Sequence, residues 1–155
     1  MNVRIETKPA LRVAGLAVKN AQNEDLPNLW KRLFTEFTLT QLEGLGNGMS
    51  FGVCFEYIVE PHSFTYMAGF DLKDPERARK LGMEILDVPG AEYAIFELRG
   101  PVPTCIHQGW EYAMGTWLPQ NGYRHAGTPD FEYYPDGDTK SPDYNMELWI
   151  PIVKI

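Results

Sequence analysis

The sequence predicts an α+β fold in which two strand–helix–strand–strand units form one curved antiparallel sheet with two long helices. Two stretches have the helical period of apolar residues, and each is flanked by runs rich in β-forming residues. The two halves share this order but little residue identity, and no linker separates them. With 155 residues, the chain is long enough for one domain with a proper core, so we expect residues 1–155 to form a single domain.

The first half opens with a strand that ends at Pro9, and a second strand is expected from about Leu11 to Val18. The segment "NEDLPNLWKRLFTEFTLTQL" has an amphipathic helical period, and the glycines of "EGLGNG" end it. Its expected core residues are Trp30, Leu33, Phe34 and Phe37. The strands "MSFGVCFEYIV" and "SFTYMAGFDL" follow, joined by the turn "EPH". A short surface helix that begins near Asp74 and a short strand "MEILDV" complete this half.

In the second half, "EYAIFELRG" is an expected strand and "PVPTCIHQGWEYAMGTWLPQNG" contains the second long helix. The apolar stripe of that helix comprises Ile106, Trp110, Ala113, Met114 and Trp117. "PDFEYYP" is a short strand, "DGDTKSPD" a polar loop and "YNMELWIPIVK" the last strand. Alternation along this strand places one set of residues in the core, namely Met146, Leu148, Ile150 and Ile152.

Composition excludes several classes of function. With 14 basic and 21 acidic residues, the net charge is −7, which argues against direct binding of nucleic acid and weakly favours cationic partners. No apolar run approaches the ~20 residues that span a membrane, and the N-terminus lacks the apolar core of a signal peptide. We therefore expect a cytoplasmic domain in which Cys54 and Cys105 are buried free thiols.

Motifs for metal, cofactor or nucleophile chemistry are missing from the sequence. The three histidines lie at no metal-ligand spacing, "EGLGNG" lacks the lysine of a phosphate loop, and no serine has a Gly-x-Ser-x-Gly setting. We expect no metal, no cofactor and no catalytic residue.

Glu147 stands out because it is a carboxylate at the centre of an apolar strand. Alternation puts Glu147, Trp149 and Pro151 on one face of that strand. A desolvated carboxylate must be protonated, paired or exposed to a cleft, since burying its charge alone costs several kcal/mol. Two interpretations remain open: a solvated or internally paired carboxylate, with Arg4, Arg12 or Arg99 as partner, and a binding site for an organic cation.

Four segments, in order along nearly the whole chain, resemble the gyrase-inhibitor-like domain, also called the AraC-type effector-binding domain. The first is "LRVAGLAV", and the second, "VPGAEYAIFELRGPV", resembles the Pro-Gly-x-x-Tyr-Ala-x-Phe strand of that family followed by Gly-Pro. "WLPQNGYRHAGTPDFEYYP" resembles its Trp-Leu-Pro-x-x-Gly-Tyr and Pro-x-Phe-Glu-x-Tyr motifs, and "MELWIPI" resembles its closing strand. The chain has no room for a helix-turn-helix module, so a stand-alone member is implied.

The resemblance implies two strand–helix–strand–strand units related by a pseudo-twofold, with an apolar cleft at their junction that senses lipophilic organic cations. The acidic residue of that cleft carries over by position to Glu147. Candidate ligand-binding residues are Glu147, Trp149, Tyr93, Tyr133, Phe51 and Tyr66. For Trp149, Tyr93 and Tyr133 a place at the edge of the core is the alternative. Phe51 and Tyr66 belong to alternating sets of aromatic residues, of which one set must be core.

Three functions follow from this resemblance. The first is a non-catalytic binding module for amphipathic cationic small molecules, such as drugs, dyes or related metabolites, with a possible transcription-regulator partner. The second is a hydrolase of reactive cyclopropane-bearing compounds that uses Glu147 as a general acid or base. The third is a gyrase-inhibitor-type role in binding a protein. Sequence alone favours the first, because no second catalytic group is evident and the carboxylates are scattered along the chain.

Overall fold

The computed structural model describes residues 1–60 and 62–155, so Pro61 of the expected turn "EPH" lies outside the described residues. The chain divides into two compact units. Unit 1 comprises Met1–Pro9 and Gly90–Ile155, and unit 2 comprises Ala10–Pro89. Each unit contains a strand, a long helix and two further strands in that order, with antiparallel pairing throughout, so the α+β prediction is confirmed.

Unit 2 is an antiparallel sheet of four strands in the order β3-β4-β2-β5, with its long helix on one face. Its elements are β2 (Leu11–Val18), α1 (Asp25–Glu36), α2 (Leu39–Glu43), β3 (Ser50–Ile58), β4 (Ser63–Asp71), α3 (Pro75–Lys80) and β5 (Glu84–Val88). As expected, Asp74 begins α3, since its carboxylate accepts a hydrogen bond from the backbone N–H of Glu76 at 3.1 Å.

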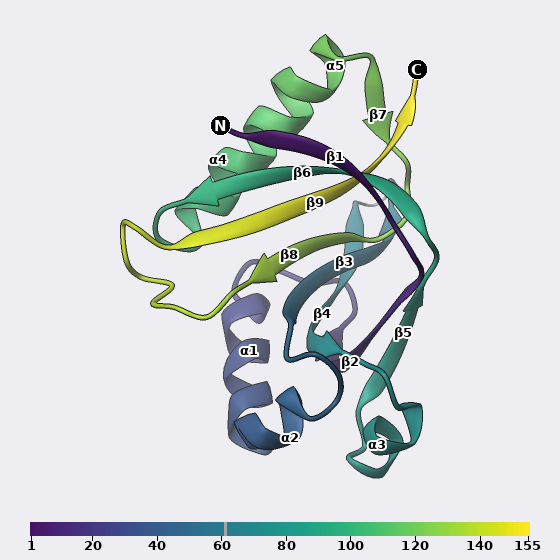
Figure 1. Cartoon of the computed structure of the whole chain (residues 1–155), viewed down its shortest axis with the longest axis vertical. Helices are drawn as coiled ribbons and strands as arrows, with labels where there is room; N and C mark the ends of the chain where they lie inside the picture. Colours follow the sequence, from purple (N-terminus) through teal and green to yellow (C-terminus); the bar gives the residue numbers. More distant parts are fainter. Residues whose placement is uncertain (61) are drawn as a thin grey trace. The chain divides into compact units, whose positions relative to one another are not determined.

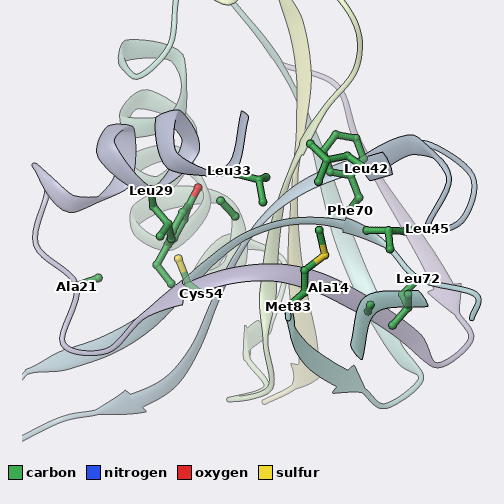
Figure 2. Packing of buried hydrophobic residues seen from close by; sticks show 13 residues of the cluster. Ala14, Ala21, Leu29, Leu33, Leu42, Leu45, Cys54, Phe70, Leu72 and Met83 are labelled. Carbon is green, nitrogen blue, oxygen red and sulfur yellow. The ribbon is translucent and has the colours of Figure 1, made fainter. Parts of the chain in front are cut away.

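Helices α1 and α2 bury their apolar side chains against this sheet. Leu29 and Leu33 of α1 and Leu42 of α2 meet Phe70 of β4 in one apolar cluster, which Figure 2 shows at close range. The free thiol of Cys54 is buried in the same cluster, as expected. This cluster is the core of unit 2.

Unit 1 is an antiparallel sheet in the order β1-β6-β9-β8, to which the short β7 adds along one end of β9. Its strands are β1 (Val3–Lys8), β6 (Ala91–Arg99), β7 (Tyr123–His125), β8 (Asp130–Tyr134) and β9 (Asn145–Lys154). Its long helix runs without a break through α4 (Thr104–Tyr112), the π-helical turn η1 (Ala113–Trp117) and α5 (Leu118–Gln120). In Figure 1 this helix follows one side of the β1, β6 and β9 ribbons.

The face of the unit 1 sheet that packs against this helix is a continuous apolar core. From β9 it takes the predicted set Met146, Leu148, Ile150 and Ile152, all buried. Phe96 of β6 and Ile106 of α4 pack with them, and so does the free thiol of Cys105. The alternation predicted for the last strand is therefore confirmed, and Glu147 points to the opposite face.

Several local features differ from the sequence expectation, among them an extended residue, Phe37, that divides the expected first helix into α1 and α2. The first strand pairs with β6 in unit 1, although it precedes the strands of unit 2 in the chain. Phe34, expected in the core, is 51% exposed, because it lies about 100° further around α1 than the buried Leu33. Met114 is also exposed, and it lies within the π-helical turn, where wider spacing shifts the apolar stripe.

No helix in the described ranges 1–60 and 62–155 has the length and apolar content needed to cross a membrane.

Two leucines on the short helix α2 test the core of unit 2. Leu42 is fully buried and Leu39 is 56% exposed, so Leu42→Ala removes packed core and Leu39→Ala does not. We expect Leu42→Ala to lower the free energy of unfolding by about 2–5 kcal/mol and Leu39→Ala by less than about 1 kcal/mol, both measured by urea denaturation. Equal losses would contradict the packing described for α2.

Candidate functional site

The candidate site lies on the face of the unit 1 sheet opposite α4. Alternation along β6, β8 and β9 brings four aromatic side chains to this face, which we call the aromatic face: Tyr93, Phe131, Tyr133 and Trp149. The register pairs Trp149 with Ile95 on one side and with Phe131 on the other. Central strand β9 therefore sets Trp149 in the middle of the group.

Ring contacts hold the aromatic face together. The ring centroid of Trp149 lies 6.1 Å from that of Tyr93, 5.6 Å from that of Phe131 and 6.0 Å from that of Tyr133. Tyr93 and Phe131 also meet edge to face, with their centroids 6.0 Å apart. Such tilted and edge-on contacts stabilise aromatic pairs beyond simple burial, so the four rings form a preorganised apolar cluster, in which Phe131 is fully buried and Trp149 is 4% exposed.

Glu147 borders this cluster and has two partners. Its Oε2 atom lies 2.9 Å from Nη2 of Arg4, and its Oε1 accepts a hydrogen bond from Nε1–H of Trp149 at 2.9 Å. The side chain of Glu147 is 21% exposed, so the pair is only partly removed from water. Of the two interpretations of Glu147 left open by the sequence, the structure contains the internal ion pair with Arg4.

Arg4 is shared among three carboxylates. Its Nε donates to Glu6 at 2.8 Å and its Nη1 lies 3.4 Å from Glu97, in addition to the bond to Glu147. The hydrogen bonds to Glu6 and then Glu147 raise the pKa of Arg4, so this guanidinium stays charged. Hydrogen bonds from Arg4 and then Lys8 lower the pKa of Glu6.

A second cation of the chain lies over the aromatic face itself. Nζ of Lys8 is 4.3 Å from the centroid of the Trp149 ring and 3.1 Å from a carboxylate oxygen of Glu6. An ammonium group at this distance from an indole face is attracted by the ring quadrupole. Strand β1 thus sets one cation at Glu147 and another over Trp149.

Burial raises the pKa of the Tyr93 phenol. The side chain is almost fully buried, and desolvation, followed by the negative charge of Asp130, raises the pKa of Tyr93 to about 12. The phenol therefore stays neutral over the physiological pH range, and Tyr93 adds an uncharged side chain to the aromatic face.

Four of the six predicted site residues come together, namely Glu147, Trp149, Tyr93 and Tyr133. The other two, Phe51 and Tyr66, belong to unit 2 and are fully buried there. They point to opposite faces of its sheet, because Phe51 pairs with Gly69 and Tyr66 with Cys54 on adjacent strands. The hydroxyl of Tyr66 accepts a hydrogen bond from Nε1–H of Trp30 at 2.9 Å. A ligand-binding role for Phe51 and Tyr66 stays a prediction.

Sequence reasoning missed Phe131 and Lys8 as members of this site, and it named Arg4 only as one of three possible partners of Glu147. A usable signal exists in "RIETK", where Arg4, Glu6 and Lys8 alternate and so share one face of a strand. What the sequence does not reveal is that this strand pairs with β6.

Two further acidic residues are buried in unit 1 away from the network around Glu147. Glu132 accepts a hydrogen bond from the hydroxyl of Tyr134 at 2.8 Å, and Asp130 lies 3.1 Å from Nε2 of His125. Because Nδ1 of His125 accepts the backbone N–H of Gly127 at 2.9 Å, both ring nitrogens are engaged. Over residues 1–60 and 62–155, no group of three or more histidine, cysteine or acidic side chains could hold a metal ion.

The model of the family described as the GyrI-like small molecule binding domain matches residues 1–153 of the chain. The chain belongs to the GyrI-like family. No curated protein sequence matches it. The match covers both units of the GyrI-like chain, and the aromatic face lies within it.

Solved structures share this fold. SAV2435 bound to tetraphenylphosphonium has a TM-score of 0.82 at 22% identity, covering 99% of this chain and 94% of that one. The EcmrR C-terminal domain has a TM-score of 0.70 at 14% identity, and the match covers 99% of this chain and 98% of that domain. In the EcmrR–DNA complex the match covers 58% of the EcmrR chain. A hydrolase from Listeria innocua has a TM-score of 0.62 at 10% identity, and the match covers 97% of this chain and 91% of the hydrolase chain.

Replacing Glu147 by glutamine tests how much the pair with Arg4 stabilises this GyrI-like fold. Since the pair is partly solvated and Arg4 keeps Glu6 and Glu97, we expect Glu147→Gln to change the free energy of unfolding by less than about 1 kcal/mol. Glu147→Ala also removes the acceptor of the Trp149 N–H, so we expect it to lower the free energy of unfolding by about 1–3 kcal/mol. Urea denaturation measures both. A large loss in the glutamine variant would mean that the ion pair is a main support of the fold.

The raised pKa of Tyr93 predicts a loss of stability in alkali. A tyrosine whose pKa is about 12 when folded and about 10 when unfolded stabilises the fold fully below pH 10, and this contribution disappears as the pH rises toward 12. When the pH is raised from 9.5 to 11.5, the free energy of unfolding should fall by about 2 kcal/mol less in Tyr93→Phe than in the unsubstituted protein. Urea denaturation at the two pH values measures this difference. The variant Tyr57→Phe, at an exposed tyrosine, should follow the unsubstituted protein.

Proposed function

We propose that this GyrI-like chain is a single, non-catalytic effector-binding domain, residues 1–155, for amphipathic organic cations. In this proposal Glu147 supplies the charge partner, and Trp149, Tyr93 and Tyr133 supply apolar contact. Phe131 joins them from the same face. Phe51 and Tyr66 are kept as candidate contacts from unit 2.

One observation carries the proposal: the aromatic face already holds cations. A guanidinium lies against the carboxylate of Glu147 and an ammonium lies over the ring of Trp149. These are the two ways in which proteins bind an organic cation, by a charge-assisted contact and by the face of an aromatic ring. A ligand with one positive charge and aromatic surface meets the same two features.

The energies favour a cation over a neutral molecule of the same shape. Contact of a cation with an aromatic face adds about 0.5–2 kcal/mol, and a hydrogen bond to a charged group adds about 1.5–3 kcal/mol where the cation carries an N–H donor. Apolar burial is common to both molecules, at roughly 25 cal/mol per Å². Charge therefore decides selectivity, while aromatic area supplies affinity.

Two structural relatives support this choice of ligand and role. SAV2435 is bound to tetraphenylphosphonium, which is a lipophilic cation, and EcmrR forms a complex with DNA. The EcmrR C-terminal domain alone is matched over 98% of its length, and this supports the proposal that the present chain corresponds to that part of such a system. We propose that any effect on transcription passes through a partner protein, because the net charge of −7 disfavours direct binding of DNA.

Tetraphenylphosphonium and tetraphenylborate test the proposal, since they have the same shape and opposite charge. We expect the protein to bind tetraphenylphosphonium at least tenfold more tightly, and Glu147→Gln to reduce this preference by about tenfold, or ~1.4 kcal/mol. Isothermal titration calorimetry in sodium buffer measures all four affinities.

Glu97→Gln is the matched control for this experiment. Glu97 lies directly opposite Glu147 in the register of β6 and β9, and its side chain is 51% exposed. The control removes the same charge from the same face, so we expect it to change the preference by less than about threefold. Equal binding of the two probes by the unsubstituted protein, or equal effects of the two variants, would contradict the proposed role of Glu147.

A further inference from the structure

The edge strand β1 presents a row of charged side chains to the aromatic face. Its register with β6 places Arg4 opposite Ile95 and Glu6 opposite Tyr93. From this row, Arg4 reaches across β6 to Glu147 on β9, two strands away. The guanidinium that neutralises Glu147 thus comes from a strand at the border of the unit 1 sheet.

Arg4 is held in a way that lets it release Glu147 without becoming unpaired. Three different nitrogens make its three contacts: Nε with Glu6, Nη1 with Glu97 and Nη2 with Glu147. Glu6 is the stronger anchor, with a distance of 2.8 Å, and both it and Glu97 are well exposed. Because the guanidinium is planar and rigid, a movement of its end that breaks the Nη2 contact also carries Nη1 away from Glu97, while Nε can stay at Glu6.

The balance of charges around Glu147 also allows one more cation to bind there. The network contains two cations, Arg4 and Lys8, and three carboxylates, those of Glu6, Glu97 and Glu147. One more positive charge neutralises it. An entering organic cation can therefore take Glu147 while Arg4 and Lys8 stay with Glu6, and Glu97, whose side chain is 51% exposed, is solvated by water.

We propose that Arg4 is a built-in competitor for the cation site, which sets the affinity of the protein for its ligand. The inference rests on the proposed function. In the ligand-free protein Arg4 occupies Glu147, and a cationic ligand binds by displacing it toward Glu6. The apparent dissociation constant is the intrinsic one divided by the fraction of molecules in which Glu147 is released.

This competition has a consequence for selectivity. A small amine offers Glu147 no more than Arg4 already does, whereas Arg4 is tethered and acts at a high effective concentration. Only a cation that also takes the place of Lys8 over the ring of Trp149 gains enough to displace Arg4. Arg4 thus excludes small amines and admits lipophilic cations.

Arg4→Met tests the inference, since methionine keeps much of the side-chain length and removes the charge. We expect the variant to bind tetraphenylphosphonium at least fivefold more tightly than the unsubstituted protein, with no gain for tetraphenylborate. The double variant Arg4→Met/Glu147→Gln should show no such gain over Glu147→Gln, because the competitor acts only through Glu147. Isothermal titration calorimetry supplies the affinities, and circular dichroism with urea denaturation checks folding.

Arg12→Met is the control for net charge. Arg12 pairs with Asp87 on the surface of unit 2 at 2.9 Å, so this variant changes the charge by the same amount and leaves Glu147 untouched. Its affinity for tetraphenylphosphonium should stay within twofold of the unsubstituted protein. An equal gain in Arg12→Met would overturn the inference, because the effect would then be one of overall charge. If Arg4→Met folds poorly, Arg4→Gln provides the same comparison.

Outcomes for the inference and for the proposed function differ. If the unsubstituted protein prefers tetraphenylphosphonium and Arg4→Met does not bind it more tightly, the competitor role is wrong and the proposed function stands. If neither the unsubstituted protein nor a folded Arg4 variant prefers the cation, both are wrong. If only the Arg4 variant binds tetraphenylphosphonium measurably, the inference is supported in its strongest form.

Discussion

The antiparallel pairing of β9 with β6 on one side and β8 on the other is the constraint on which the rest of unit 1 depends. Because side chains alternate along every strand, this one register decides both faces of the sheet at once. It sends Leu148 into the core beneath α4 and Trp149 to the opposite face, among aromatic residues of the neighbouring strands. A slip of one residue would bury Glu147 in the core instead.

Two contacts compensate the carboxylate of Glu147 for its partial removal from water. One carboxylate oxygen accepts the indole N–H of Trp149, and the other meets the guanidinium of Arg4, while about a fifth of the side chain remains exposed. An ion pair in this setting contributes little to stability, since desolvation offsets most of the Coulombic attraction. In the proposed function, an ion pair of this kind matters because a ligand can displace Arg4 from Glu147 at little cost in free energy.

Much of the site could be predicted from single strands, and the limit of prediction is set by strand order. The alternation in "NMELWIPI" correctly separated Glu147 and Trp149 from the core set, and the family resemblance added Tyr93 and Tyr133, which lie on the same face. Arg4 was only one of three possible partners, because no local pattern says which distant strand lies beside a given one. The same gap explains why Phe131 was missed, although its strand was predicted.

The sequence by itself determined the elements of this protein and the direction of their side chains, because apolar periodicity, β-propensity and turn residues act over a few neighbouring positions. Only the tertiary structure decided that β1, separated from β6 by the whole of unit 2, closes the border of the unit 1 sheet. That pairing is a long-range contact. Backbone hydrogen bonds permit many combinations of strands, and the packing of the complete chain selects one of them. It brings Arg4 to Glu147 and Lys8 to Trp149, so the electrostatics of the site are a product of topology.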